Sequence, residues 1–339
     1  MPDRSLAEFL LLDPEEQRDV YATAAAETGL PSKILEKDVW ICWTLDVLFS
    51  IEPHPSMAFK GGTSLSKVYG AINRFSEDID VTMDLDPERE GAIPTSRNGR
   101  DRLREDLAAL LEQHLAEVVV PAFVTPLGRY VIDPENHVVM TDAETIVIDY
   151  PSAYPKIGDY VAERVKVEFG ARNMVTPQER HEVRPYVAPF ILDYSVTLPV
   201  ATIDVLSAER TFWEKATLAH DECNRSAFTR DTAARISRHW YDLARLSEHP
   251  IAPAALGDAA LLGEVVAVKT AFYARGTSHY DDCLAGKIRL VPDDAGLAAL
   301  RADYAEMVAA GMFQGEAPPF DWVIDRVTAL EETIRARTG

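Results

Sequence analysis

The sequence predicts a bilobed α/β (α+β) chain, in which a domain with a mixed β-sheet precedes a helical domain. Strand-like segments gather between 118 and 205, apolar residues recur at helical spacing from 206 to the end, and a Gly-rich turn precedes an alternating strand. A chain of 339 residues suffices for about two domains. We therefore place the first domain, with a helical N-terminal extension, at 1–205 and the helical domain at 206–339.

The first fifty residues predict two helices. Asp13 is placed to cap a helix beginning at Pro14, Glu16 has the spacing of a capping box, and Gly29 follows the helix end. In KILEKDVWICWTLDVLF, which follows, apolar residues keep a three-to-four spacing that indicates a second helix.

The segment 57–85 predicts a turn between a short strand and a helix, and then a longer strand. MAFKGGTSLSKVYG places two glycines after an apolar run. In RFSEDIDVTMDL, Ile79 and Val81 alternate with Asp78 and Asp80, so the two acids share one face of a strand.

Further along, a loop is expected at PEREGAIPTSRNGR and an amphipathic helix at DRLREDLAALLEQHLAEVV. From Val118 we expect strands at VVVPAFV, YVID, HVVM, TIVIDY, ERVKVEFG and YSVTLPV, with RNMVTPQERHEVRPYVAP as a connection. After Val205, five segments have helical periodicity, and we expect four aromatic residues there to pack in the core: Phe212, Trp213, Trp240 and Tyr241.

Composition excludes several classes of protein. The chain has 55 acids, 34 lysines and arginines and a net charge of −21, which argues against non-specific duplex binding and anionic membranes. Three dispersed cysteines rule out a disulfide framework and suit the cytoplasm. No apolar run at the N-terminus has the length of a membrane span, and no zinc, P-loop, GxGxxG or GxSxG motif is present.

Gly61-Gly62-Thr63-Ser64 is a candidate phosphate-binding turn. Glycines allow close approach to the backbone, helix-start N–H groups attract anions, and the two hydroxyl groups add donors. The alternative is a simple turn with a helix cap.

Asp78 and Asp80 are candidate metal ligands. Carboxylates at i and i+2 of a strand can hold hard cations, and two Mg²⁺ ions would clamp the oxygens of a phosphoryl displacement. The alternative is a solvated strand face, but the buried residues between the acids and the turn upstream favour a site.

These residues resemble a known family. FKGGTSLSKVYGAINRFSEDIDV is similar to the signature of the AbiEii/AbiGii toxin nucleotidyltransferases, relatives of the MenT toxins in the DNA polymerase β-like superfamily. The resemblance extends to Glu36-Lys37-Asp38 upstream and to two downstream motifs, Glu214-Lys215-Ala216 and Arg238-His239-Trp240-Tyr241-Asp242-Leu243. It implies a polymerase β-like nucleotidyltransferase domain at 1–205.

The resemblance also implies roles for single residues. Gly61, Gly62, Thr63 and Ser64 would hold nucleotide phosphates, and Asp78 and Asp80 would bind Mg²⁺ or Mn²⁺. Lys215 would meet the triphosphate and Asp242 would support the site. Many members have Arg-Asp where this chain has Arg238-His239, which leaves open whether Asp242 or His239 fills the fourth motif.

Three further residues are candidates for this site. Lys60 and Arg74 flank the turn and the strand, where each could neutralise phosphate; the alternatives are a solvated lysine and an arginine paired with Glu77. Glu168, which shares a strand face with Lys166, is a candidate third metal ligand; the alternative is a Lys–Glu pair on an edge strand.

The resemblance implies the toxin of a toxin–antitoxin system, with a cognate antitoxin as a possible partner. Such an enzyme would move NMP from an NTP to a hydroxyl group, plausibly of RNA at the 3′ end of tRNA, and release pyrophosphate. The acidic charge leaves two alternatives open: a protein or small-molecule acceptor, and a nucleotide-binding module without catalysis. No membrane partner is expected.

Overall fold

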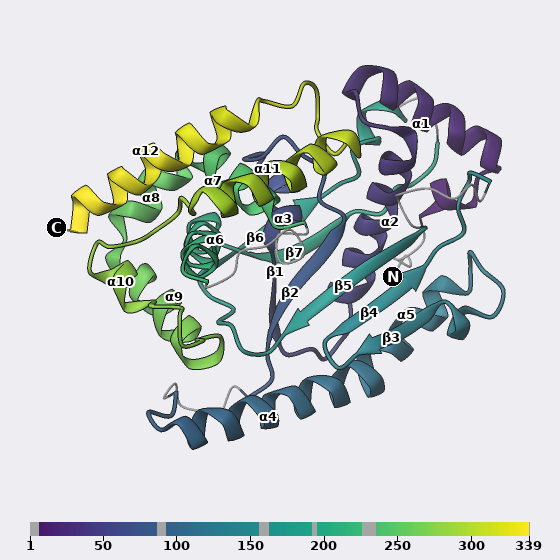
Figure 1. The fold of residues 1–339 in the computed structure, drawn as a ribbon. Coiled ribbons are helices and arrows are strands. Elements are labelled where there is room, and N and C mark those ends of the chain that lie inside the picture. The colour runs from purple at the N-terminus through teal and green to yellow at the C-terminus, as the bar shows by residue number, and fades with distance from the viewer. Residues whose placement is uncertain (1–6, 87–92, 156–162, 192–194, 226–234, 339) are drawn as a thin grey trace. The chain divides into compact units, whose positions relative to one another are not determined.

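The computed structural model describes residues 7–86, 93–155, 163–191, 195–225 and 235–338 (Figure 1). The chain divides into two compact units. Unit 1 comprises Met1–Tyr69 and Arg74–Leu206, and unit 2 comprises Gly70–Asn73 and Ser207–Gly339.

Unit 1 is built on a mixed sheet, as the sequence predicts. Within the described residues the sheet has seven strands in the order β3-β4-β5-β2-β1-β7-β6. β2 pairs in parallel with β5 and antiparallel with β1, so it lies inside the sheet. The strands are β1 Ser56–Lys60, β2 Asp78–Asp84, β3 Val138–Asp142, β4 Thr145–Asp149, β5 Arg164–Gly170, β6 Gln178–Val183 and β7 Ala201–Leu206.

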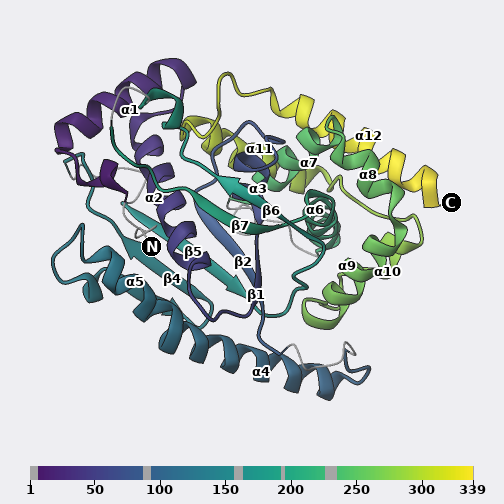
Figure 2. The same ribbon diagram turned by 180° about the vertical axis from the view of Figure 1, so that it is seen from behind.

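Helices cover one face of this sheet. α2 packs against β5, β7 and α5, and Figure 2 shows it crossing in front of the strands. Ile79 and Val81 of β2 are buried, whereas Asp78 and Asp80 alternate with them on the opposite face. The helices of unit 1 are α1 Pro14–Thr28, α2 Ser32–Phe49, α3 Gly61–Lys67, α4 Arg97–His114 and α5 Val120–Leu127, with 3₁₀ turns at Glu8–Leu11, Pro134–Asn136 and Ala188–Phe190.

The predicted helix signals at the N-terminus are confirmed. Asp13 accepts a hydrogen bond from the Glu15 N–H and forms a capping box with Glu16, and Gly29 ends α1 with a φ of 72°. Two tryptophans of α2, Trp40 and Trp43, are fully buried.

The expected strand at VVVPAFV is wrong, because the chain remains helical there. A π-helical turn, Leu115–Val119, joins α4 to α5, and Pro121, which lacks an N–H, follows directly. The apolar residues continue one stripe at i, i+4 spacing, and all are buried: Leu107, Leu111, Leu115, Val119, Phe123 and Leu127. That stripe outweighs the strand preference of three consecutive valines.

The continuous helix Arg97–Leu127 is also long and apolar enough, by length and composition, to cross a membrane, with a mean hydropathy of 1.5 over 18 residues. Among the described residues, the bent pair Ile251–Gly257 and Ala259–Phe272 passes the same test only when counted together. In that window 28% of the residues are buried, and one such helix is weak evidence of a membrane span.

Three other expectations in the β region need correction. The expected connection contains β6, Gln178–Val183, which pairs with β7 at one end of the sheet. The sequence pattern did not indicate β6 because this segment is rich in charged residues, and an edge strand can carry polar side chains on both faces. YVID lies in turns, and 195–200 has no regular structure, since the strand begins at Ala201. The expected strands at HVVM, TIVIDY and ERVKVEFG are confirmed as β3, β4 and β5.

The regular elements in the described part of unit 2 after Val205 are helices, as predicted. Three of its helices begin at side-chain caps: Ser207 for α6, Asp258 for α9 and Asp293 for α11. The expected aromatic core is confirmed, because Phe212, Trp213, Trp240 and Tyr241 are all buried. The expected helix from Arg230 lies partly outside the described residues. The helices are α6 Ala208–Cys223, α7 Ser237–Ser247, α8 Ile251–Gly257, α9 Ala259–Phe272, α10 Asp281–Leu284, α11 Asp294–Ala309 and α12 Phe320–Thr338.

Candidate active site

The Gly-rich turn brings the backbone of Gly61 directly against Asp80. Gly61 has a φ of 82°, and a Cβ atom there would lie 2.1 Å from the Asp80 Oδ2. Both the backbone conformation and the close approach therefore require glycine. The turn and one carboxylate of the DxD motif thus form a single structure.

The hydroxyl groups of the turn bind the backbone of unit 1. Thr63 and Ser64 are fully buried. The Thr63 hydroxyl donates to the carbonyl oxygen of Asp78 at 2.5 Å and lies 3.2 Å from that of Ser76. The Ser64 hydroxyl donates to the carbonyl oxygen of Gly61 at 2.9 Å. In this conformation Thr63 ties the turn to the start of β2, and neither hydroxyl group is directed to solvent.

Arg74 lies against the second glycine of the turn. Its side chain is buried, its Nη1 donates to the Phe75 carbonyl oxygen at 3.1 Å, and a Cβ atom on Gly62 would lie 2.8 Å from its Nη2. A permanently charged guanidinium group therefore stands beside the turn, where it favours an anion. Glu77, the partner considered for Arg74, has an ion pair with Lys37 at 2.9 Å.

Strand register places three acids and two lysines on one face of the sheet. Asp80 is opposite Glu168 of β5 and Lys60 of β1, and Asp78 is opposite Lys166. Side chains at paired positions of adjacent strands lie on the same face. Glu168 is on an interior strand, and its side chain forms an ion pair with Lys166.

The donor set of this face suits a hard cation. Asp78, Asp80 and Glu168 offer carboxylate oxygens, the ligands that Mg²⁺ prefers. Among the described residues, however, no group of three or more His, Cys, Asp or Glu side chains is gathered as a metal site. The residues therefore fit a metal bound through Asp78 and Asp80, with Glu168 available after it leaves Lys166.

Buried charges on α2 hold the turn and the DxD strand in place. Lys37 pairs with Glu77, the residue before Asp78. Asp38, fully buried, pairs with Lys67 at the end of α3 at 2.5 Å and accepts the Tyr186 N–H at 2.7 Å. Burial alone would lower the pKa of Lys67, but the Asp38 carboxylate raises it above its usual value, so Lys67 remains charged.

Glu36, the remaining residue of the Glu36-Lys37-Asp38 motif, binds a different loop. Glu36 accepts hydrogen bonds from the Ser152 hydroxyl at 2.7 Å and the Ala153 N–H at 2.6 Å. Burial raises the pKa of Glu36, and these two hydrogen bonds oppose the rise. The sequence indicated this motif only by resemblance; its pairing with Lys67, Glu77 and Ser152 was missed, because partners far apart in the chain leave no local pattern.

In unit 2, Lys215 lies between the two candidates for the fourth motif. Its Nζ is 2.9 Å from the Asp242 Oδ2 and 3.4 Å from the His239 Nδ1. Asp242 is fully buried and the Lys215 side chain is 7% exposed. The structure thus places α6 and α7 so that Asp242 and His239 both contact Lys215, and the ion pair is to Asp242. Glu214, a partner considered for Lys215, forms an ion pair with Arg210 at 3.8 Å.

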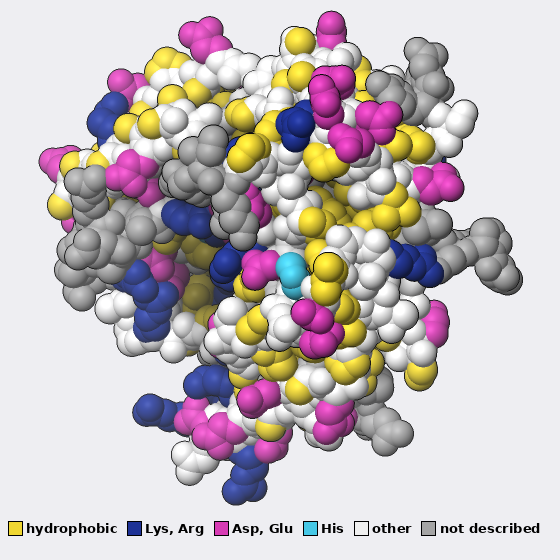
Figure 3. All heavy atoms as spheres, turned by 90° about the vertical axis from the view of Figure 1, so that its right-hand side faces the viewer, with side chains coloured by type: hydrophobic (Ala, Val, Ile, Leu, Met, Phe, Trp, Pro, Cys, Tyr) yellow, Lys and Arg dark blue, Asp and Glu magenta, His cyan; other side chains and the backbone are white. Residues whose placement is uncertain are grey.

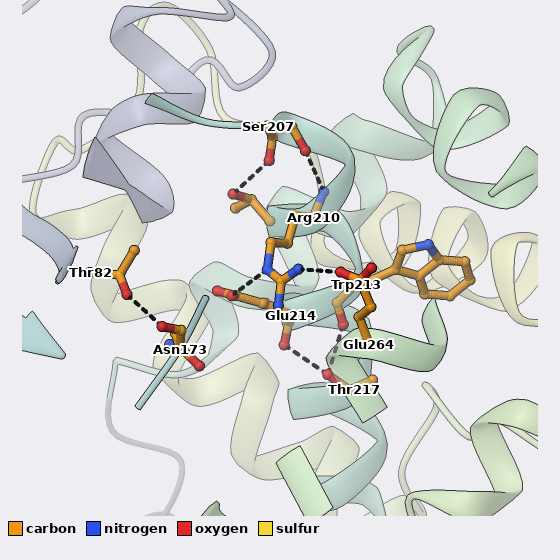
Figure 4. A network of polar contacts seen from close by, with 9 residues as sticks. Thr82, Asn173, Ser207, Arg210, Trp213, Glu214, Thr217 and Glu264 are labelled. Atoms are coloured by element: carbon orange, nitrogen blue, oxygen red, sulfur yellow. Dashed lines mark hydrogen bonds and ion pairs between the residues drawn. The ribbon is translucent and has the colours of Figure 1, made fainter. Parts of the chain in front are cut away.

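A buried arginine holds the helix that carries Lys215. Figure 4 shows the Arg210 guanidinium between Glu214, on the same helix, and Glu264 of α9, with N–O distances of 3.8 and 3.1 Å. The Thr217 hydroxyl donates to the Trp213 carbonyl oxygen at 2.7 Å. These contacts fix α6 around the position of Lys215.

Asp303 of α11 caps the helix that carries His239 and Asp242. Its carboxylate accepts the N–H groups of Arg235 and Ser237, at 2.5 and 2.8 Å. The sequence did not indicate this cap, because the acid is some 60 residues away from the helix start that it binds.

Comparisons with known proteins find a family match and similar solved structures. Residues 46–326 match the model of the family described as nucleotidyl transferase AbiEii toxin, type IV TA system. No curated protein matches the chain. Two solved structures are similar: MenT4, a nucleotidyltransferase toxin from Mycobacterium tuberculosis H37Rv, and a protein from H. pylori described provisionally as a nucleotidyltransferase.

The likeness to these structures is distant. MenT4 is 19% identical, with a TM-score of 0.44 over 95% of this chain and 98% of that one. The H. pylori protein is 14% identical, with a TM-score of 0.40 over 91% of this chain and 97% of that one.

Proposed function

The chain belongs to the AbiEii family of nucleotidyl transferase toxins of type IV toxin–antitoxin systems, and we propose that it moves a nucleoside monophosphate from an NTP to a hydroxyl group of RNA. The acceptor oxygen would bond to the α-phosphorus, the bond to pyrophosphate would break, and the hydroxyl proton would leave to solvent. The 3′ end of tRNA is the proposed acceptor, and the cytoplasm, which supplies NTPs and RNA, is the proposed location.

The contact between Gly61 and Asp80 carries this proposal. It joins a backbone turn that lets phosphate approach closely to a carboxylate of the DxD pair, with Asp78 on the same strand face. Asp78 and Asp80 would hold Mg²⁺ or Mn²⁺, which supplies charge neutralisation for the phosphates and lowers the pKa of the acceptor hydroxyl.

Chain residues have separate parts in this reaction. Gly61 and Gly62 would give the triphosphate access to the backbone, and Arg74 beside them would stabilise its negative charge. Lys60, half-buried opposite Asp80, adds a cation on the same strand face. Lys215, oriented by Asp242, would offset charge on the leaving pyrophosphate.

The test offers each radiolabelled NTP, with Mg²⁺, to total RNA and to total protein. We expect label in RNA, and we expect Asp80→Ala to lower its incorporation at least about a hundredfold, since a metal ligand contributes several kcal/mol. Asp84→Ala, on the same face at the other end of β2, is the matched control and should retain activity. Label in protein alone would favour the alternative acceptor, and equal activity of the two variants would remove Asp80 from the site.

A further inference from the structure

The first half of α4 carries a concentration of arginines in an acidic chain. Four of the eight residues 97–104 are arginines and one is an aspartate, whereas the whole chain has a net charge of −21. Arg97, Arg100 and Arg104 follow at i, i+3 and i+7 and so share one helix face, whereas Arg102 is on the other side of the helix. We name Arg97, Arg100 and Arg104 the α4 arginine face.

Folding of unit 1 does not account for this face. None of the residues 97–106 is buried, and the first buried side chain of α4 is Leu107. The first turn has no acid, although the N-terminus of a helix carries partial positive charge and disfavours cations. Three turns of helix thus bury no side chain and place like charges at the positive pole, an arrangement that a bound polyanion would stabilise.

The side chains are accessible. The side chain of Arg97 is 88% exposed and that of Arg104 is 42% exposed, and both form long ion pairs with Asp101 of the same helix, at 3.8 and 3.5 Å. At the lower edge of the face drawn in Figure 3, the part of the molecule where Figure 1 places α4, basic and acidic side chains project together. Residues 97–106 contain four arginines and three acids, Asp101, Glu105 and Asp106, so this stretch has a net charge of +1 in a chain at −21.

The chemistry of this face fits phosphodiesters better than a lipid surface. Between residues 97 and 106 the only apolar side chain is Leu103, so this part of α4 has no apolar face that could enter a lipid layer. Arginine forks match phosphate geometry, and a chain at −21 needs a local basic surface to hold RNA.

We propose that the α4 arginine face binds the phosphate backbone of the acceptor RNA. This rests on the proposed function. Asp78 and Asp80 are among the first residues of β2, a strand of seven residues that spans about 20 Å, and α4 comes after this strand in the chain. The face therefore contacts RNA away from the reacting 3′ end, and a short acceptor does not reach it.

The test replaces Arg97, Arg100 and Arg104 by Gln together. The matched control replaces three other exposed arginines by Gln, Arg180, Arg184 and Arg301, so that both proteins lose the same charge. Fluorescence anisotropy measures binding of labelled total tRNA between 50 and 200 mM salt without NTP, and circular dichroism checks folding.

We expect the α4 variant to bind tRNA at least about tenfold more weakly than the control and to reduce the slope of log affinity against log salt by about 2. Its KM for tRNA should rise while its turnover of a short oligoribonucleotide acceptor stays that of wild type. Equal tRNA affinity of the two variants overturns the proposal. Because binding is measured without NTP, a failure of RNA binding at this face can be told apart from a failure of the proposed transfer reaction.

Discussion

At the residue scale, the site depends on one atom that glycine lacks. The Asp80 carboxylate occupies the place where a Cβ atom of residue 61 would lie, so the first glycine and the second acid of the motifs constrain each other. Eighteen residues separate them in the chain, and the fold brings them into contact.

Gly61→Ala should therefore abolish transfer. The added Cβ would displace the Asp80 carboxylate, and the φ of 82° would cost about 1–2 kcal/mol for any other residue. Gly70→Ala is the control, because Gly70 also has a positive φ, of 57°, but no atom within 4 Å of an added Cβ. Turnover and urea unfolding of both variants separate the effect of the clash with Asp80 from the cost of the positive φ. An active Gly61→Ala variant would contradict the assignment of Gly61 and Asp80 to one site.

A second residue-scale prediction decides between Asp242 and His239. The buried ion pair of Lys215 is with Asp242, so Asp242→Asn should lower the free energy of unfolding by about 3 kcal/mol and sharply reduce turnover. His239→Asn removes the 3.4 Å contact with Lys215, which is longer than the ion pair, and should cost roughly 1 kcal/mol. Urea unfolding and NTP turnover check both; a larger loss in His239→Asn would assign the fourth motif to the histidine.

At the scale of elements, buried charges join α2 to the turn helix. Asp38 and Lys67 are both almost completely inaccessible, and the Lys67 ammonium also lies 4.0 Å from the centre of the Tyr186 ring. Removing one charge of such a pair leaves the other unsatisfied in a medium of low polarity.

Asp38→Ala should thus lower the free energy of unfolding by about 3–5 kcal/mol. Lys67→Met in the same background should recover part of that loss, because the uncompensated ammonium is removed. Urea titrations of the two proteins measure this. A loss below about 1 kcal/mol in Asp38→Ala, or no recovery in the double variant, would show that the pair does not hold α3.

His220 makes the packing of α6 sensitive to pH. Burial lowers the pKa of this imidazole below its usual value, and its Nδ1 accepts the Arg289 N–H at 2.9 Å, which requires a neutral nitrogen. The unfolded chain takes up a proton near pH 6.5, where the folded chain does not, so stability should fall as pH drops through and below 6.5.

His220→Gln should weaken that pH dependence, because the titrating group is absent. Urea unfolding at pH 7.5 and 5.5 compares the two proteins. If wild type and variant lose the same stability on acidification, His220 does not remain neutral in the folded chain.

At the scale of the whole molecule, the net negative charge makes stability depend on salt. A net charge of −21 repels itself in the folded state more than in the expanded unfolded state. Raising NaCl from 20 to 200 mM should screen this repulsion and raise the melting temperature by about 2–4 °C, which corresponds to roughly 1 kcal/mol. Thermal unfolding followed by circular dichroism tests this; a fall in melting temperature would mean that specific ion pairs outweigh the net repulsion.

The sequence alone determined the features that rest on near neighbours. The capping box of α1, the alternation of β2 and the turn of Gly61 each depend on residues a few positions apart, so spacing was sufficient to predict them. The same is true of the α/β class of the fold and of the family, whose signature occupies one continuous segment.

Only the tertiary structure decided which partners the polar residues take. Strand register placed Glu168 opposite Asp80. Helix packing allowed two ion pairs to form, Lys215 with Asp242 and Lys67 with Asp38. It also kept Val120–Leu127 helical, because burial of a continuous stripe outweighed local strand preference. Burial and ion pairing act between residues that are distant in the chain, and such contacts leave no periodic pattern by which they could be predicted.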